Sequence, residues 1–154
     1  MRLFPFFGKK KDIFTPEENA LIVEAIRNAE MQTCGEIRVF IENKCRFVDA
    51  MDRALELFDN LKMQNTHHRN GVLLYVAIKD HQLAVFGDTG INEKVGHEYW
   101  VNAVKLILAH FNREKYAEGI ANCVKQIGES LHQHFPYNST EDKNELPDEI
   151  IFGN

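Results

Sequence analysis

The stretch GVLLYVAI at residues 71–78 decides the fold class, because it is apolar without the alternation of a half-buried strand. Continuous apolar runs of this length are typical of strands that helices cover on both faces of a sheet. We therefore expect an interior strand here. Lys79 and Asp80 separate it from a second apolar run at residues 82–86. This spacing predicts a β-hairpin, although the connection lacks the glycine that tight turns prefer.

Upstream of this strand, the sequence predicts a helix followed by another strand. Thr15 can cap a helix, Pro16 fits its first turn, and Glu18 can return a hydrogen bond to the cap. Apolar residues then recur at helical spacing and predict one buried stripe, made of Leu21, Ile22, Ala25, Ile26 and Ala29. Residues 35–42 alternate, which predicts a strand at or near a sheet edge.

Three further helices complete the predicted order of elements. Their core-facing residues are Phe47, Met51, Ala54, Phe58 and Leu61 in the first, Trp100, Val104, Ile107, Leu108 and Phe111 in the second, and Tyr116, Ile120, Val124, Ile127, Leu131 and Phe135 in the third. A strand–helix–strand crossover makes the first two strands parallel, and the hairpin makes the third antiparallel. We predict a three-layer α/β/α sandwich with a small mixed sheet of three to four strands.

The domain boundaries follow from shifts in composition. Residues 1–12 form a basic and apolar N-terminal tail, residues 13–135 the α/β domain, and residues 136–154 an acidic tail whose apolar end, 150–152, can add an edge strand. The N-terminal tail combines leucine and phenylalanine side chains with three lysines that follow them, so we expect weak attachment to an anionic membrane surface through residues 1–11. A tail without order and a tail folded back on the protein are the alternatives.

Charge and cysteine usage exclude several classes of protein. The 154 residues carry a formal charge of −5, and four of the 18 basic residues lie within residues 1–11. The remainder has 14 basic against 23 acidic residues, which argues against nucleic-acid binding. Three cysteines without a C-x-x-C pair suit reduced thiols. Without a signal peptide or an apolar run of about 18 residues, we expect a cytoplasmic protein.

Strand directions bring polar residues together at one edge of the predicted sheet. Glu36 begins the first strand, Arg69 and Asn70 precede the second, and Asp88 follows the third. Carboxylate and amide oxygens suit Ca²⁺ or Mg²⁺, so we expect Asp88 as the chief metal ligand with Glu36 and Asn70 in support. Arg69 can clamp a phosphate at two points. Alternatively, these residues only shape turns and cap helices.

The opposite edge is a competing candidate. Open α/β sheets bind ligands beyond the carboxyl ends of their parallel strands. That rule nominates Glu42, Asn43, Cys45, Asp80 and His81. No nucleotide-binding glycine loop and no nucleophile elbow is present, so we expect no nucleotide or organic cofactor. The Asp-Thr-Gly triplet at 88–90 is not an aspartic protease site, because that family is mostly β.

Three segments, taken in order, resemble the TPM domain family: AEMQTCGEIRV at 29–39, THHRNGVLLYVA at 66–77 and GDTGI at 87–91. The resemblance covers residues 13–135, and NELPD at 144–148 is similar to the tail of short soluble bacterial members. It implies an α/β/α sandwich. It also implies either acid phosphatase activity with divalent cations, as in members from the thylakoid lumen, or a role in membrane-protein maintenance or binding.

Two functional hypotheses follow. The first is a divalent-cation-dependent phosphatase with Arg69 and Asp88 as catalytic residues, acting on a phosphorylated small molecule or protein through metal-activated water. The alternative is a non-catalytic module that binds a protein, at the membrane or elsewhere.

Overall fold

A computed structural model describes residues 13–46, 49–111, 115–137 and 149–153 of the chain. The elements follow one another as α2 (Pro16–Glu30), β1 (Glu36–Glu42), α3 (Ala50–Asn60), β2 (Gly71–Ala77), β3 (Gln82–Gly87), α4 (Thr89–Val95), α5 (His97–Phe111), α6 (Tyr116–His134) and β4 (Ile151–Phe152). Residues 1–12 and 138–148 lie outside the described residues, as does Phe47 of the predicted second helix. The predicted domain boundaries therefore stay predictions.

The four strands form one mixed sheet in the order β3-β2-β1-β4. β1 and β2 run parallel from the pair Glu36–Gly71 onward, and β3 returns antiparallel with Gly87 opposite Val72. All seven residues of β2 are buried, so the apolar run forms an interior strand as predicted. The hairpin is confirmed as well. Instead of a glycine, His81 takes the left-handed backbone conformation, with φ at 51°.

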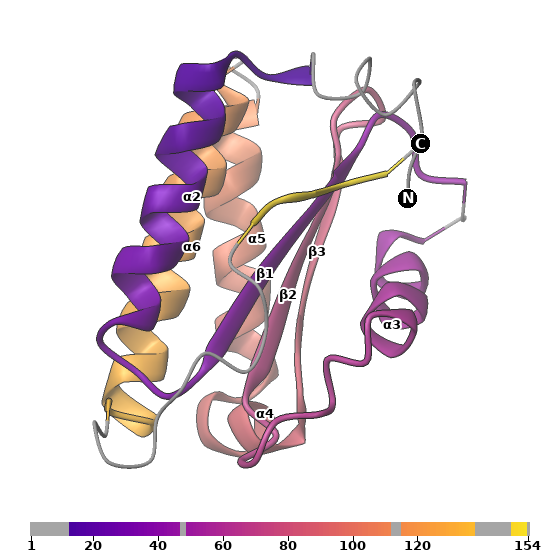
Figure 1. The fold of residues 1–154 in the computed structure, drawn as a ribbon. Coiled ribbons are helices and arrows are strands. Elements are labelled where there is room, and N and C mark those ends of the chain that lie inside the picture. Colours follow the sequence, from indigo (N-terminus) through magenta and orange to yellow (C-terminus); the bar gives the residue numbers. More distant parts are fainter. Residues whose placement is uncertain (1–12, 47–48, 112–114, 138–148, 154) are drawn as a thin grey trace.

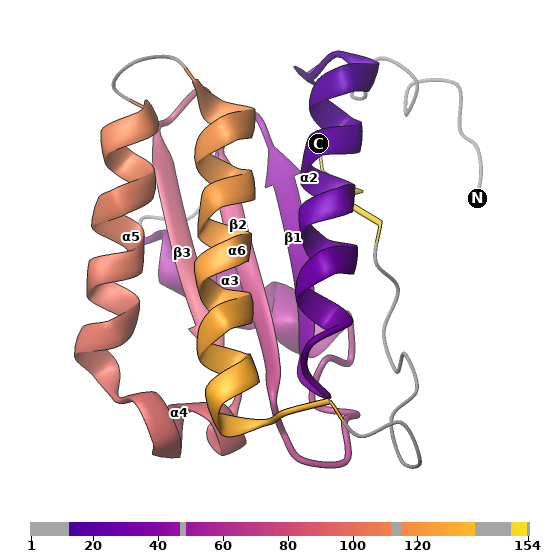
Figure 2. The same cartoon turned by 90° about the vertical axis from the view of Figure 1, so that its left-hand side faces the viewer.

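Helices cover both faces of the sheet and confirm the predicted sandwich. α2, α5 and α6 lie on one face and α3 lies on the other (Figure 1). Viewed from the side of the three helices, α6 stands between α5 and α2 in front of the sheet (Figure 2). Alternate residues of the strands divide the core accordingly: Val72, Leu74 and Val76 pack toward the three helices, while Leu73 and Tyr75 pack toward α3.

The first helix begins as the sequence predicts. Thr15 Oγ1 accepts a hydrogen bond from the Glu18 amide, and Glu18 Oε1 accepts one from the Thr15 amide, which completes a capping box. Ile22, Ile26 and Ala29 are buried. Leu21 belongs to the same predicted stripe, but it is 46% exposed because it lies at the margin of the surface that α2 shares with α6.

Strand β1 lies next to the edge of the sheet, as its alternation predicts, but its polar face is buried. All seven of its residues are buried, including Glu36, Arg38 and Glu42. The C-terminal residues Ile151 and Phe152 pair with β1 as an edge strand, and α3 packs on the face that the polar residues share. β1 therefore lies next to the edge, and its polar face is inside the protein.

Helix α4 is an element that the sequence pattern does not predict. Asp88 caps this seven-residue helix by accepting a hydrogen bond from the Thr89 amide. Gly96 follows with φ at 80°, a left-handed conformation that favours glycine, and this turn leads directly into α5. An aspartate before a helix is a recognised start signal, but so short an element shows too little apolar periodicity to be identified.

Candidate functional site

The polar edge predicted from strand directions is present in the structure. Glu36 at the start of β1 lies opposite Gly71 at the start of β2, and the Asp88 amide donates to the Gly71 carbonyl at 2.9 Å. Three neighbouring strands therefore contribute the candidate residues. This arrangement follows from the parallel pairing of β1 with β2 and the return of β3 beside them.

Arg69 and Asp88 form a two-point ion pair at this edge. Arg69 Nε donates to Asp88 Oδ2 at 2.7 Å, and Nη2 donates to Oδ1 at 2.8 Å. The Asp88 side chain is 3% exposed, whereas that of Arg69 is 50% exposed. The hydrogen bonds from Arg69 to Asp88, and then their opposite charges, raise the pKa of Arg69. The pair thus presents a buried carboxylate behind a guanidinium that faces water.

The backbone around this pair holds both partners in place. Asp88 Oδ1 also accepts from the Thr89 amide at 2.7 Å, so one carboxylate caps α4 and binds Arg69. Arg69 has φ at 51°, and its carbonyl accepts from the Gly90 amide at 2.8 Å. A Cβ at position 90 would lie 2.1 Å from the His68 carbonyl oxygen, so only glycine lets the two segments approach this closely.

Asn70 is fully buried beside the ion pair. Its amide donates to Thr66 Oγ1 at 3.3 Å, and its side-chain Nδ2 contacts Cys34 Sγ at 3.6 Å. Among the described residues, Asn70 Oδ1 has no hydrogen-bond partner. A buried amide oxygen without a partner is uncommon and costs free energy, so it is a candidate ligand for a bound cation or water.

Glu36 is 3% exposed and lies at the same edge, where its amide donates to the Asn70 carbonyl at 3.3 Å. The pleat of β1 directs Glu36 to the face that Phe40 shares with α3. The structure therefore brings Arg69 and Asp88 into contact and places Asn70 and Glu36 on adjacent strand starts.

These oxygens fit a hard divalent cation in part. The described residues contain no group of three or more His, Cys, Asp or Glu side chains that could hold a metal ion. Asp88 retains acceptor capacity beyond its three hydrogen bonds, since a carboxylate offers about four lone-pair sites. Mg²⁺ is typically bound through one or two carboxylates, with water and substrate phosphate completing its shell. Asp88, Glu36 and Asn70 carry oxygens of the types that such a cation binds.

The opposite edge contains a buried cluster around Glu42. Arg53 donates to both Glu42 oxygens at 3.0 and 3.2 Å, and the Tyr75 hydroxyl donates to Oε2 at 2.5 Å. Burial, and then the bond to Glu42, raises the pKa of Tyr75 well above its usual 10.0. The Glu42 carboxylate is thus bound on several sides by the protein itself.

The other candidates at this second edge also contact the protein. Asp80 Oδ2 accepts from the Cys45 amide at 2.7 Å, and the Asn43 carbonyl accepts from the Lys79 amide at 2.8 Å. His81 Nε2 lies 3.2 Å from the Tyr116 hydroxyl oxygen. These contacts hold the hairpin against the segment that follows β1 and against the start of α6. The first edge, with its exposed guanidinium and unpartnered amide oxygen, is the better candidate site.

Comparison with known proteins identifies the family. The TPM domain model matches residues 9–130. The chain belongs to the TPM domain family. The TPM domain of this protein is similar to the NMR structure of BA42 from the psychrophilic bacterium Bizionia argentinensis, with 40% identity, a TM-score of 0.83, and coverage of 91% of this chain and 95% of BA42.

A more distant TPM-like fold is the N-terminal domain of cg2496 from Corynebacterium glutamicum. It shares 14% identity at a TM-score of 0.62, covering 77% of this chain and 74% of that domain, and so shows likeness of fold alone. No curated protein matches the sequence. Across the described parts of this TPM domain, no helix is both long and apolar enough to cross a bilayer.

Two residues of the second edge are not evident as site residues from the sequence. The helical pattern places Arg53 on the solvent side of its helix, and Tyr75 belongs to the apolar run of the interior strand. The parallel pairing of β1 with β2 brings Tyr75 to Glu42, and the packing of α3 on the sheet brings Arg53 there. The signal in the sequence is a glutamate at the end of a strand whose alternate residues are apolar, because a carboxylate that becomes buried needs partners.

Proposed function

We propose that this TPM domain is a divalent-cation-dependent phosphatase whose site is the edge formed by Glu36, Arg69, Asn70 and Asp88. One observation carries the proposal. The buried Asp88 carboxylate is held by the two-point fork of a half-exposed arginine. A phosphate offers the same pair of oxygens to that fork, so a phosphomonoester can exchange with Asp88 as the partner of Arg69.

Each residue then has a separate role. Asp88 is the chief ligand of the cation, and Glu36 and the Asn70 amide oxygen support it. Such a cation lowers the pKa of bound water and supplies hydroxide near neutral pH. Arg69 holds the phosphate and balances its charge. Because Asp88 also caps α4, release of Arg69 leaves the carboxylate anchored by the Thr89 amide.

Hydrolysis of a generic phosphomonoester with Mg²⁺ or Ca²⁺ tests this function. We expect Asp88→Asn to lower the rate by about 10²-fold or more, since it removes the charge that holds the cation while keeping a capping oxygen. Arg69→Lys keeps the charge but loses the two-point fork, so we expect it to bind the ester more weakly. Asp59→Asn, on the exposed surface of α3, is the matched control.

A rate that is the same in wild type and Asp88→Asn, with or without chelator, would refute the phosphatase. A purification contaminant would give that result, because its activity does not depend on residue 88.

A second candidate is a non-catalytic module that binds a protein, linked to membrane-protein maintenance. A groove of about 610 Å³ between α2 and α6 favours it. Leu21 and Met31 line this groove and are 46% and 66% exposed. Exposed apolar side chains grouped in a groove are typical of surfaces that bind proteins.

Metal titration separates the two candidates. A cation that binds only the folded protein raises its unfolding free energy, by about 2.7 kcal/mol at a concentration 100 times its dissociation constant. An increase in melting temperature with millimolar Ca²⁺ or Mg²⁺, absent from Asp88→Asn, supports the metal site. No increase with any divalent ion favours the binding module.

A further inference from the structure

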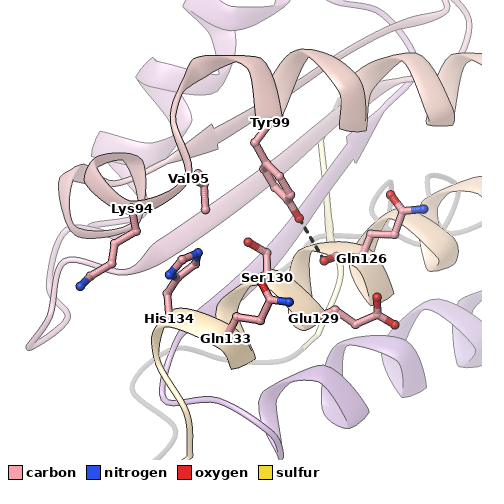
Figure 3. A pocket seen from close by; sticks show the side chains of 8 residues that line it. All are labelled: Lys94, Val95, Tyr99, Gln126, Glu129, Ser130, Gln133 and His134. Carbon is pink, nitrogen blue, oxygen red and sulfur yellow. Dashed lines mark hydrogen bonds between the residues drawn. The ribbon is translucent and has the colours of Figure 1, made fainter.

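A second pocket, of about 410 Å³, lies between the α4–α5 segment and the C-terminal half of α6. Figure 3 shows Lys94 and Val95 on one side, Tyr99 above, and Ser130 and His134 on α6 opposite them. This volume is within the range of small-molecule sites. The pocket contains none of the four residues assigned to the phosphatase site, so a ligand here would be separate from that site.

One wall of the pocket is held by a hydrogen bond. The Tyr99 hydroxyl donates to the Gln126 carbonyl at 3.0 Å. Burial raises the pKa of Tyr99, and Ser130 lies close enough to lower it by a smaller amount, so this phenol stays a neutral hydrogen-bonding group near neutral pH. The pocket therefore has polar atoms in set positions before any ligand arrives.

The connection that carries Tyr99 and Lys94 is fixed as well. Trp100 Nε1 donates to Asn92 Oδ1 at 2.6 Å, and Asn92 Nδ2 donates to the Gly87 carbonyl at 2.7 Å. These bonds tie α5 and α4 to the end of β3. The pocket is thus anchored to the sheet through both helices.

Charge is divided between the two ends of the pocket. Lys94 and His134 lie at one end, and Glu129 lies at the other (Figure 3). Lys94 Nζ is 5.9 Å from the centre of the ring of Phe135, the residue after His134, and Figure 3 shows the Lys94 side chain directed away from Tyr99. An imidazole donates an N–H in either tautomer, so His134 can join Lys94 in binding an anion.

We propose that this pocket binds a small molecule that carries one anionic group and one ammonium group, separated by a short apolar chain. The anion contacts Lys94 and His134. The ammonium group faces Glu129. Val95 and the Tyr99 ring contact the chain between the charges. Glu129 would repel a ligand with negative charge at both ends, so the pocket selects against dicarboxylates and diphosphates.

Three aminoethyl compounds test which anion is preferred: taurine, phosphoethanolamine and β-alanine carry a sulfonate, a phosphate and a carboxylate. Taurine and β-alanine contain no phosphoester, so their binding is independent of any hydrolysis at Asp88. Binding is followed on the full chain through the backbone amide signals of residues 94–99 and 126–134 by NMR. Ethanesulfonate lacks the ammonium group and ethanolamine lacks the anion.

We expect saturable shifts at these amides with at least one aminoethyl anion, and weaker binding of both single-charge compounds. Lys94→Gln should weaken binding by about 2- to 5-fold, as for an exposed charge pair, and Lys94→Arg should restore it. Glu129→Gln should weaken binding of taurine but not of ethanesulfonate. Lys125→Gln, on the same helix but in the groove with α2, is the matched control.

Three outcomes would overturn the proposal. The first is the absence of saturable shifts with all three aminoethyl anions. The second is equal binding by wild type and Lys94→Gln. The third is a set of shifts centred on Arg69 and Asp88, which would place the anion at the other site. Arg69→Gln separates the two sites, because it should leave taurine binding unchanged even if it abolishes hydrolysis.

Discussion

Gly128 on α6 sets how closely this helix approaches α2, and its replacement by alanine tests that packing. A Cβ at position 128 would lie 2.5 Å from Ala29 Cβ and 3.2 Å from Ala29 Cα. Carbon atoms pack best at about 3.5 to 4.0 Å, so the two helices must move apart to admit one methyl group. The sheet side of the same helices holds Ile26 and Ile127, both fully buried, which opposes that movement.

Two effects of opposite sign determine the size of the change. Overpacking a tight core costs about 1 to 3 kcal/mol, whereas alanine gains about 1 kcal/mol over glycine inside a helix. We expect Gly128→Ala to lower the free energy of unfolding by about 1 kcal/mol. Ala29→Gly should lower it by about 1.5 to 2 kcal/mol, because it loses helix propensity and one buried methyl group.

The double variant Ala29→Gly/Gly128→Ala carries the decisive result. It moves the methyl group from one helix to the other, so the propensity terms cancel and the clash is relieved. We expect nearly wild-type stability, which corresponds to a favourable coupling of about 2.5 to 3 kcal/mol.

Urea unfolding measures all three variants, with Lys125→Ala as a control on the exposed surface of α6. Additive effects, or a Gly128→Ala protein more stable than wild type, would show that the helices are not tightly packed at this point.

Three further predictions concern the second edge, the buried tyrosine and cysteine, and the N-terminal tail. Tyr75→Phe should lower the free energy of unfolding by about 1.5 to 3 kcal/mol, because it removes a hydrogen bond to the Glu42 carboxylate. Tyr99→Phe should lower it by less, because the Tyr99 hydroxyl donates to a neutral carbonyl. Equal losses for the two variants in urea unfolding would contradict this. Burial raises the pKa of Tyr75 and brings that of Cys123 to about 12, so the unfolded chain releases these protons first and stability should fall as pH rises from about 9 to 11. Urea midpoints that stay constant over this range would refute the assignment, and Cys123→Ala should flatten the first part of the decline. Full-length protein should co-sediment weakly with anionic vesicles at low salt and less at high salt; equal recovery of a chain that begins at residue 12 would remove this role from residues 1–11.

The interior of the fold follows from local patterns in the sequence. Residues 71–78 are apolar on both faces, and that pattern requires layers above and below a central strand. The Thr15–Glu18 capping box joins residues three apart, so its hydrogen bonds depend on residue types and spacing alone. The strand–helix–strand crossover and the hairpin then set the directions of β1, β2 and β3, and these directions bring Glu36, Arg69 and Asp88 to one edge.

Which groups the polar side chains bind, by contrast, depends on tertiary contacts. The alternation in β1 predicts a place at or near the sheet edge, but its polar face is buried, since Ile151 and Phe152 pair with β1 from the far end of the chain while Arg53 on α3 binds Glu42. Likewise, nothing in the local sequence indicates that Asp88 both caps α4 and binds Arg69. Periodicity reports how much of an element is apolar, whereas the partners of a buried charge depend on segments that meet only when the chain is folded.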